Sequence, residues 1–219
     1  MGIMLGAILP SLLAAVVVSR AVRAAAPQAF ANDAVSTVMY QCVFYAVLLT
    51  ALYLLTVFRY AQPFWRALGW TFAFRGAWLC LLTAPLLAVG LSAVGVLLRT
   101  PPIVSPIEDL LDSGVSQAAM MAFIAVLGPL WEELMFRGFL YPLLERALGP
   151  WPAILLSAAP FALIHGAQNQ WLWQPLLLIG LAGAVFGYAR YKTGSTAAAA
   201  LLHIGYNSTL LVGFLLQRG

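Results

Sequence analysis

Long apolar stretches follow one another along the 219-residue chain, separated by short connections that are polar or rich in proline. A membrane-spanning helix needs about 20 consecutive, mostly apolar residues, and the stretches are close to that length. The pattern therefore predicts an all-α fold, a polytopic transmembrane helical bundle with about seven spans. The predicted spans lie near residues 3–19, 36–58, 76–98, 116–147, 151–167, 171–190 and 195–216.

Two of the connections have a character of their own. Residues 60–75 mix aromatic side chains with Arg66 and Arg75, which is typical of a helix at the level of the lipid head groups. Residues 99–115 form the longest polar connection, and their prolines interrupt any long helix. We expect an exposed turn there, with three acidic side chains facing water: Glu108, Asp109 and Asp112.

Small residues follow one face of the sixth predicted span. Gly183 and Gly187 have the G-x-x-x-G spacing, and Gly180 lies one turn earlier. Glycines at this spacing let two membrane helices approach each other closely. We interpret them as a packing surface.

The composition supports lipid as the solvent of this chain. Hydrophobic residues make up 63% of it and charged residues 8%, whereas soluble domains carry about 25% charged residues. The net charge of +4 comes from cations beside apolar stretches, which suits lipid head groups rather than nucleic acid. No internal repeat is visible, so we expect a single integral membrane domain over residues 1–219. Cys42 and Cys80 lack metal-ligand spacing and are predicted to be buried thiols.

A few ionisable side chains lie away from the loops, at membrane depth. A charge at the bilayer centre costs at least ~2.5–3.5 kcal/mol on insertion scales, so each such group needs a partner or a function. Both histidines of the chain are among them. The group consists of Glu132, Glu133, Arg137, His165 and His203.

The two adjacent acids are not equivalent. Residues four apart lie on one face of a helix, so Glu133 and Arg137 are expected to form an ion pair. Glu132 points about 100° away from this face and has no such partner on its own helix. It must therefore find a partner on another helix or take up a proton, which suits a general base or acid.

The histidines lie on later predicted helices. His203 and Asn207 are four residues apart, so they offer hydrogen-bond donors on one helix face, as an oxyanion hole requires. His165 ends an apolar run, one turn after Phe161. A single buried histidine is more often a packing residue than a catalytic one, so position along the helices matters.

Depth along the helices connects these segments. Measured from the neighbouring loops at 1.5 Å per residue, Glu132 lies at ~24 Å, His165 at ~21 Å, and His203 and Asn207 at ~14 and ~20 Å. All four can meet in one layer of the bundle. The agreement predicts one site that combines them.

Three short motifs follow one another in this part of the chain. "EELMFR" (Glu132 to Arg137) fits E-E-x-x-x-R, "FALIH" (161–165) fits F-x-x-x-H, and "HIGYN" (203–207) fits H-x-x-x-N. In this order they resemble the motifs of the CPBP family. That family comprises the CAAX prenyl endopeptidases that process Ras-like proteins, and bacterial relatives linked to bacteriocin processing and immunity. The resemblance covers residues 116–212, the expected catalytic core, and no motif departs from the family pattern.

The resemblance implies an intramembrane endopeptidase that cleaves a membrane-associated protein or peptide near its C-terminus. Glu132 would activate the attacking water, and His165 would help to hold it. His203 and Asn207 would stabilise the oxyanion, while the adjacent ion pair would support the site. The implied partners are a membrane-anchored substrate and the lipid bilayer. A multi-pass protein of a prokaryotic inner membrane is expected.

The metal dependence and two other functions stay open at this point. The family has been described both as metalloproteases and as metal-free glutamate proteases, and Glu132, His165 and His203 could make a zinc site. H-E-x-x-H is absent and Asn207 suits an oxyanion better than zinc, so we expect a glutamic protease without a metal cofactor. The alternatives are a non-proteolytic peptide-binding or bacteriocin-immunity protein, and a transporter-like protein that relays protons.

Overall fold

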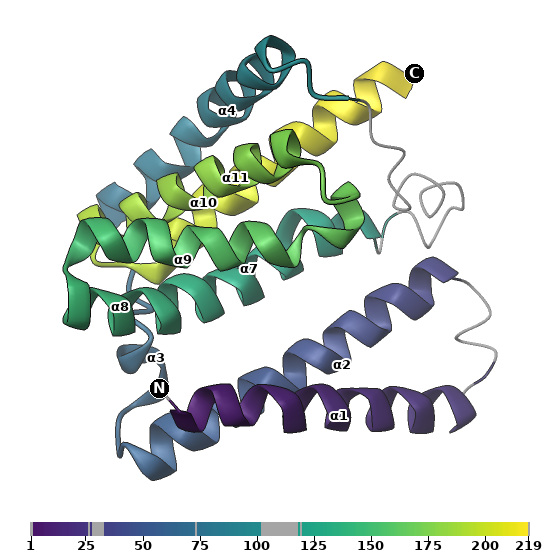
Figure 1. Cartoon of the computed structure of the whole chain (residues 1–219), viewed down its shortest axis with the longest axis vertical. Coiled ribbons are helices and arrows are strands. Elements are labelled where there is room, and N and C mark those ends of the chain that lie inside the picture. Colours follow the sequence, from purple (N-terminus) through teal and green to yellow (C-terminus); the bar gives the residue numbers. More distant parts are fainter. Residues whose placement is uncertain are drawn as a thin grey trace. The chain divides into compact units, whose positions relative to one another are not determined.

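The computed structural model describes residues 2–25, 27, 33–72, 74–101, 118 and 120–218. Within these residues the regular structure is helical throughout, without a strand, which confirms the all-α fold class (Figure 1). Helices account for most of each of the seven predicted spans as far as they are described, and the differences are a few residues at span ends. The predicted acidic turn with Glu108, Asp109 and Asp112 lies outside the described residues.

Along the chain, α-helices alternate with short π-helical stretches (η2, η3 and η4) and a 3₁₀ turn (η5). In order, these elements are α1 (Gly2–Ala25), α2 (Asp33–Leu54), η2 (Leu55–Arg59), α3 (Phe64–Ala67), α4 (Phe74–Leu97), η3 (Phe123–Leu127), α7 (Gly128–Glu133), η4 (Leu134–Leu140), α8 (Tyr141–Leu148), α9 (Pro150–Ile164), η5 (Ala167–Asn169), α10 (Trp173–Thr193) and α11 (Thr196–Arg218).

The chain divides into two compact units. The first consists of Met1–Phe64 and Ile107–Phe123, and the second of Trp65–Pro106 and Ile124–Gly219. In the first unit α1 packs along α2 (Figure 1). The residues of the expected active site all belong to the second unit. The single integral membrane domain over residues 1–219 stays a prediction.

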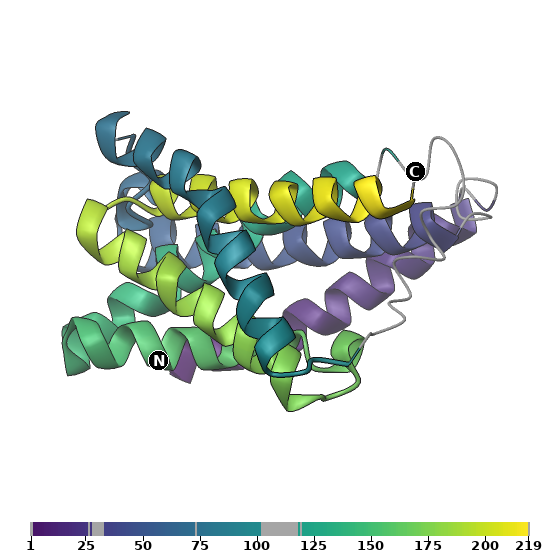
Figure 2. The same ribbon diagram turned by 90° about the horizontal axis from the view of Figure 1, so that it is seen from above.

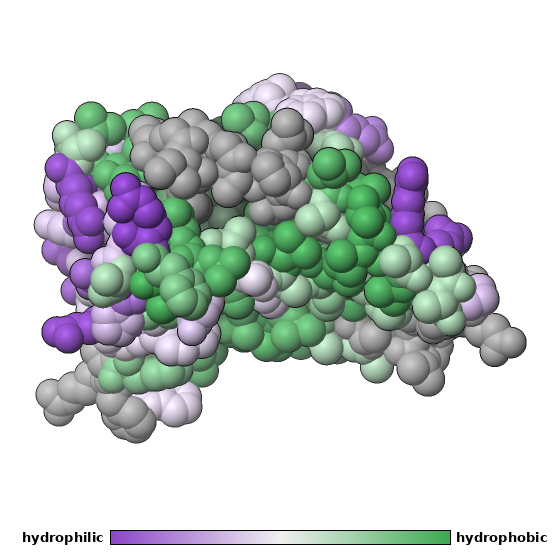
Figure 3. All heavy atoms as spheres, turned by 90° about the horizontal axis from the view of Figure 1, so that it is seen from below, coloured by the Kyte–Doolittle hydropathy of each residue, from purple (hydrophilic) through white to green (hydrophobic). Residues whose placement is uncertain are grey.

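The long helices expose apolar side chains, as an integral membrane protein requires. In α4, for example, Leu82 and Leu86 are 70% and 74% exposed. Figure 3 shows hydrophobic residues gathered across the middle of one face, with hydrophilic residues towards its ends. Three helices of the described part are long and apolar enough to cross a membrane, and α9 is apolar but shorter. The three are Val38–Arg59, Gly76–Leu97 and Thr196–Gln217.

In the second unit α4 crosses α11, and α10 packs against both α9 and α11 (Figure 2). The crossing is close because small residues meet there. A Cβ atom added to Gly205 would lie 2.6 Å from the Cβ of Ala84. Around this crossing lies a core of buried side chains: Ala84, Phe161, Ala182, Phe186, Ala189 and Leu202.

Local signals in the sequence set where the helices of this unit begin and end. Gly149, with φ of +81°, precedes Pro150 at the first position of α9, where the missing N–H costs nothing. Gly194, with φ of +66°, ends α10. Ser195 then caps α11, because its Oγ accepts the N–H of Ala198 at 3.2 Å.

Two details differ from the expectations. The predicted interfacial helix at 60–75 is wrong in extent: α3 ends at Ala67, because the chain turns at Gly69, which has φ of +62°, and Phe74 already begins α4. The predicted burial of the cysteines is also wrong in degree. Cys42 and Cys80 are unbonded thiols of intermediate exposure, since the helices that carry them are largely uncovered.

Candidate active site

The two acids lie in a helical run that leads from η3 to α8 without a break. Glu132 and Glu133 are the last residues of α7, and the π-helical stretches η3 and η4 flank that helix on both sides. A π turn contains an extra residue, so it shifts the direction of the side chains that follow, and such turns are frequent at functional sites. The acids therefore occupy a locally irregular part of the second unit.

The ion pair expected from the i, i+4 spacing is present and completely buried. Arg137 Nη1 donates to Glu133 Oε1 at 2.9 Å, and both side chains are 0% exposed. Arg137 Nη2 donates to the carbonyl oxygen of Gly183 in α10 at 2.5 Å. Among the described residues, Glu133 Oε2 and Arg137 Nε have no hydrogen-bond partner. The guanidinium thus connects the acid-bearing helix to α10 through single hydrogen bonds.

Gly183 belongs to the glycine-rich face of α10. Its neighbours at the same spacing meet α9 as expected for a packing surface, since a Cβ on Gly187 would lie 3.4 Å from Ile154. A Cβ on Gly183 itself would lie 2.8 Å from the ring of Phe161 and 3.1 Å from Nη2 of Arg137. Gly183 therefore both packs and leaves room for the buried cation.

Aromatic rings surround Arg137. Its Cζ lies 4.6 Å from the ring centroid of Phe161, 5.5 Å from that of Phe186 and 5.9 Å from that of Phe136. The faces of aromatic rings attract cations. Phe186 also stacks on the imidazole of His203, with 4.4 Å between centroids. The rings exclude water from the charged pair and fix the plane of His203.

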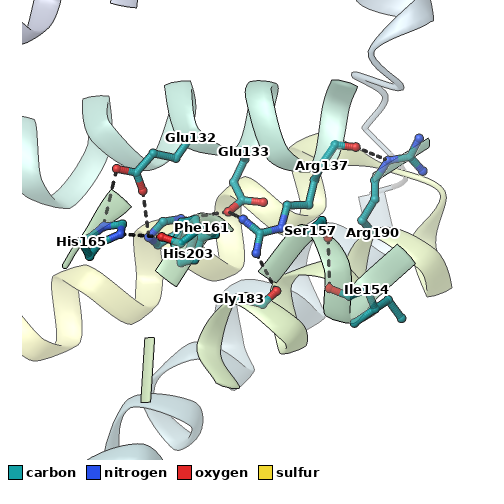
Figure 4. A network of polar contacts seen from close by, with 10 residues as sticks. All are labelled: Glu132, Glu133, Arg137, Ile154, Ser157, Phe161, His165, Gly183, Arg190 and His203. Atoms are coloured by element: carbon teal, nitrogen blue, oxygen red, sulfur yellow. Dashed lines mark hydrogen bonds and ion pairs between the residues drawn. The ribbon is translucent and has the colours of Figure 1, made fainter. Parts of the chain in front are cut away.

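His203 reaches both acids. Its Nδ1 lies 3.0 Å from Glu133 Oε1 and its Nε2 lies 3.8 Å from Glu132 Oε2 (Figure 4). An ionised carboxylate only accepts hydrogen bonds, so Nδ1 carries a proton. Nε2 is left directed at Glu132, either as a lone pair or, in the protonated ring, as a second donor.

His165 approaches Glu132 from α9. Its Nδ1 lies 2.8 Å from the carbonyl oxygen of Phe161 and therefore carries the proton. That carbonyl is available because the N–H of His165 donates to Ala162 instead. The Nε2 atom lies 3.9 Å from Glu132 Oε1 (Figure 4). Asn169 donates to the carbonyl of His165 at 2.8 Å and holds the turn.

Glu132 is thus the residue at which the two histidines meet. One carboxylate oxygen faces each imidazole, and the side chain is 13% exposed. Separations of 3.8 and 3.9 Å exceed those of a direct hydrogen bond. Of the four residues expected from their depth to share one site, the structure brings Glu132, His165 and His203 together, and their catalytic roles stay predictions.

Asn207 takes a different contact. Its Nδ2 donates to the carbonyl oxygen of Ile124 in η3 at 2.9 Å. This uses one of the two N–H groups of the amide. Its assignment as an oxyanion donor stays a prediction.

Sequence reasoning missed two residues of this region. Gly183 was assigned to packing alone, and nothing in the motif indicated that its carbonyl binds Arg137. Arg190, near the end of α10, resembles an ordinary loop cation in the sequence. In the structure its Nε donates to the carbonyl of Arg137 at 3.2 Å (Figure 4).

The fit to a metal ion can be judged from the side chains. Within the described ranges, no three or more His, Cys, Asp and Glu side chains are grouped as a metal ion would need. The absence of a metal cofactor nevertheless stays a prediction.

Fold and site together define a helical integral membrane protein with a carboxylate held against two imidazoles. Residues 114–209 match the family model described as type II CAAX prenyl endopeptidase Rce1-like, and this segment includes every residue of the site. This part of the chain is therefore similar to the Rce1-like family, which confirms the resemblance to the CPBP family. The similarity indicates an intramembrane peptidase. No curated protein and no solved structure matches the chain significantly.

Proposed function

We propose that this protein is an intramembrane endopeptidase of the glutamic type, which cleaves a membrane-associated protein or peptide near its C-terminus. The observation that carries the proposal is the position of Glu132. Its two carboxylate oxygens face the Nε2 atoms of His165 and His203 at 3.9 and 3.8 Å. Polar groups at such separations are commonly bridged by a water molecule, and water is the nucleophile of the proposed reaction.

In the attacking step Glu132 acts as a general base. It takes one proton from a water molecule, while Nε2 of His165 accepts the hydrogen bond from the other proton and orients the oxygen. The hydroxide oxygen forms a bond to the carbonyl carbon of the scissile peptide, and the carbonyl π electrons move onto its oxygen. Collapse of this tetrahedral species breaks the C–N bond, and the proton held by Glu132 passes to the leaving nitrogen.

The developing oxyanion needs hydrogen-bond donors. His203 supplies one from Nε2 when its ring carries both protons. Glu133 stabilises the cation at Nδ1, at 3.0 Å. The second N–H of Asn207 supplies the other donor.

The substrate class follows from the family description, which names prenyl endopeptidases that act on CAAX sequences. A prenylated C-terminus is held in the bilayer by its lipid. The exposed apolar faces of the long helices, such as those of Leu82 and Leu86, allow a lipid-bearing peptide to approach from the hydrocarbon phase. We assign the protein to a prokaryotic inner membrane as part of this proposal.

The test uses the purified full-length protein in lipid nanodiscs. Two peptides are compared, one with a prenylated cysteine in a C-terminal CAAX sequence and one without the prenyl group, and mass spectrometry follows the products. We expect cleavage by the wild type, no cleavage by Glu132→Gln, and normal cleavage by Arg146→Gln, which changes an exposed cation at the end of the same helical run. A wild type that binds the prenylated peptide without cutting it would overturn the proposal in favour of a peptide-binding protein.

A further inference from the structure

The helical run that carries the two acids contains a repeated irregularity. In a π-helical turn each carbonyl oxygen accepts the N–H of the residue five positions later. The residue five positions after Ile124, in η3, is Pro129, and the one five positions after Arg137, in η4, is Pro142. Proline has no N–H. Each π stretch therefore contains one carbonyl that lacks its π-helical donor.

At the second of these positions the structure shows where the neighbouring donor goes. The N–H of Tyr141, which would serve Arg137 in an α-helix, donates to Phe136. The carbonyl of Arg137 instead accepts Nε of Arg190 from α10, at 3.2 Å (Figure 4). A side chain of another helix has replaced the backbone donor that Pro142 removes.

The carbonyl of Ile124 in η3, the first of the two positions, also binds a side chain from another helix. The carbonyl of Ile124 accepts Nδ2 of Asn207 from α11, at 2.9 Å. The stretch between the two carbonyls, which includes both acids, is thus fixed at one end by α11 and at the other by α10. A backbone carbonyl without a hydrogen-bond donor has a high free-energy cost at this depth in the bilayer. Loss of either bond is therefore unfavourable.

Arg190 is fitted closely into its place. A Cβ added to Gly69 would lie 2.5 Å from Nη2 of Arg190, so the glycine makes room for the guanidinium. The cation also lies 5.9 Å from the ring centroid of Tyr141. Tyr141 donates to Glu145 at 2.7 Å, and the charge of Glu145 interacts favourably with Arg190. These contacts hold the arginine with Nε directed at η4.

We propose that Arg190 is a positioning residue of the proposed reaction, acting through the backbone of η4. The bond from Arg190 fixes the carbonyl of Arg137, and the side chain of that residue holds Glu133 at 2.9 Å. Glu133 in turn holds the imidazole of His203 at 3.0 Å. Loss of the Arg190 bond therefore shifts the imidazole relative to Glu132. The inference rests on the proposed function, and the contact on which it depends is the hydrogen bond from Arg190 to the backbone of η4.

The test is a suppression experiment in the full-length protein. Arg190→Met removes the donor, and a misplacement of about 1 Å can lower a rate about 10²-fold, so we expect kcat to fall about 10- to 100-fold with little change in KM. Pro142→Ala returns an N–H to position 142, five residues after Arg137. The double variant is expected to recover most of the lost rate. Lys192→Met, which removes an exposed cation from the same end of α10, is the matched control and should behave as wild type.

Hydrogen–deuterium exchange of the amides of η4 gives a second readout that needs no substrate. Exchange there should be faster in Arg190→Met and return towards the wild-type rate in the double variant. Normal kcat and exchange in a folded Arg190→Met protein, or a double variant no better than the single one, would overturn the inference. If the wild type cleaves no peptide, the proposed function fails, and the exchange pattern alone decides whether Arg190 holds the helix.

Discussion

The buried polar network has two ends that differ in tightness. At the closed end Arg137 bonds to Glu133 and Gly183 at 2.9 and 2.5 Å, and both charged side chains are 0% exposed. At the open end Glu132 lies 3.9 Å from His165, and these side chains are 13% and 19% exposed. Two adjacent acids on one helix thus have opposite surroundings.

The difference shows how one helix can carry both a structural and a reactive acid. Rotation by about 100° per residue turns Glu132 away from the face that Glu133 occupies. Oε1 of Glu133 accepts from both Arg137 and His203, at 2.9 and 3.0 Å, whereas Glu132 lies 3.8 and 3.9 Å from the two imidazoles. We therefore assign a structural role to the tightly held Glu133 and the reaction to Glu132, which faces both imidazoles.

The largest effect is expected at the open end. Glu132→Gln keeps the size of the side chain but removes the base, so kcat should fall about 10²–10⁴-fold. The melting temperature should stay close to that of the wild type, because the amide of glutamine has the size and shape of the carboxylate it replaces. Peptide cleavage and thermal melts measure both quantities. A variant that keeps its kcat would remove Glu132 from the mechanism.

Glu133→Gln should have its main effect on stability. It leaves Arg137 as a buried cation without a counter-charge, and breaking such a pair costs about 3–5 kcal/mol. Equilibrium unfolding in detergent measures the loss. If Glu133→Gln stays as stable as the wild type yet loses all activity, while Glu132→Gln cleaves normally, the roles of the two acids are reversed.

Asn207 contacts the backbone of η3 and is also proposed to take part in the reaction. As an oxyanion donor its replacement by alanine should lower kcat about 10²–10³-fold with the fold intact. Adding Pro129→Ala supplies a new backbone N–H for the carbonyl of Ile124, but it cannot replace an oxyanion donor. We therefore expect no recovery of kcat in the double variant. Full recovery would show that Asn207 acts only by holding Ile124.

Gly183→Ala tests how tightly the closed end of the network is packed. The added methyl group would lie 2.8 Å from the ring of Phe161, and such overpacking costs about 1–3 kcal/mol. Gly180→Ala is the matched control one turn earlier, where the methyl group would meet Ala162 at an ordinary 3.7 Å. Unfolding experiments should show a loss only for Gly183→Ala. Equal stabilities of the two variants would mean that the closed end is less tightly packed than described.

The smallest effect is expected from chelators. If the open end uses water activated by Glu132 alone, cleavage should continue at its normal rate in the presence of EDTA or 1,10-phenanthroline. Loss of activity that zinc restores would contradict this, and would make Glu132 and both histidines metal ligands. The control is the same assay with a metal-independent protease.

Much of the fold could be predicted because membrane helices are set by local hydrophobicity. Most of each predicted span is helical where the structure is described, and the i, i+4 spacing of Glu133 and Arg137 led directly to their ion pair. The interfacial helix at 60–75 failed because the chain turns at a single glycine, Gly69. Hydrophobic periodicity reflects the average preference of a segment for a helix. It contains no information about the backbone angle of a single residue.

Sequence alone thus determined the class of protein, the helices and the residues whose charge must be compensated at depth. Only the tertiary structure decided which groups compensate them: the carbonyl of Gly183 for Arg137, the ring of Phe186 for His203, and the side chain of Arg190 for the carbonyl of Arg137. The reason is physical. Helical periodicity fixes the face on which a side chain lies, whereas its partner depends on which helix packs against that face and at what height.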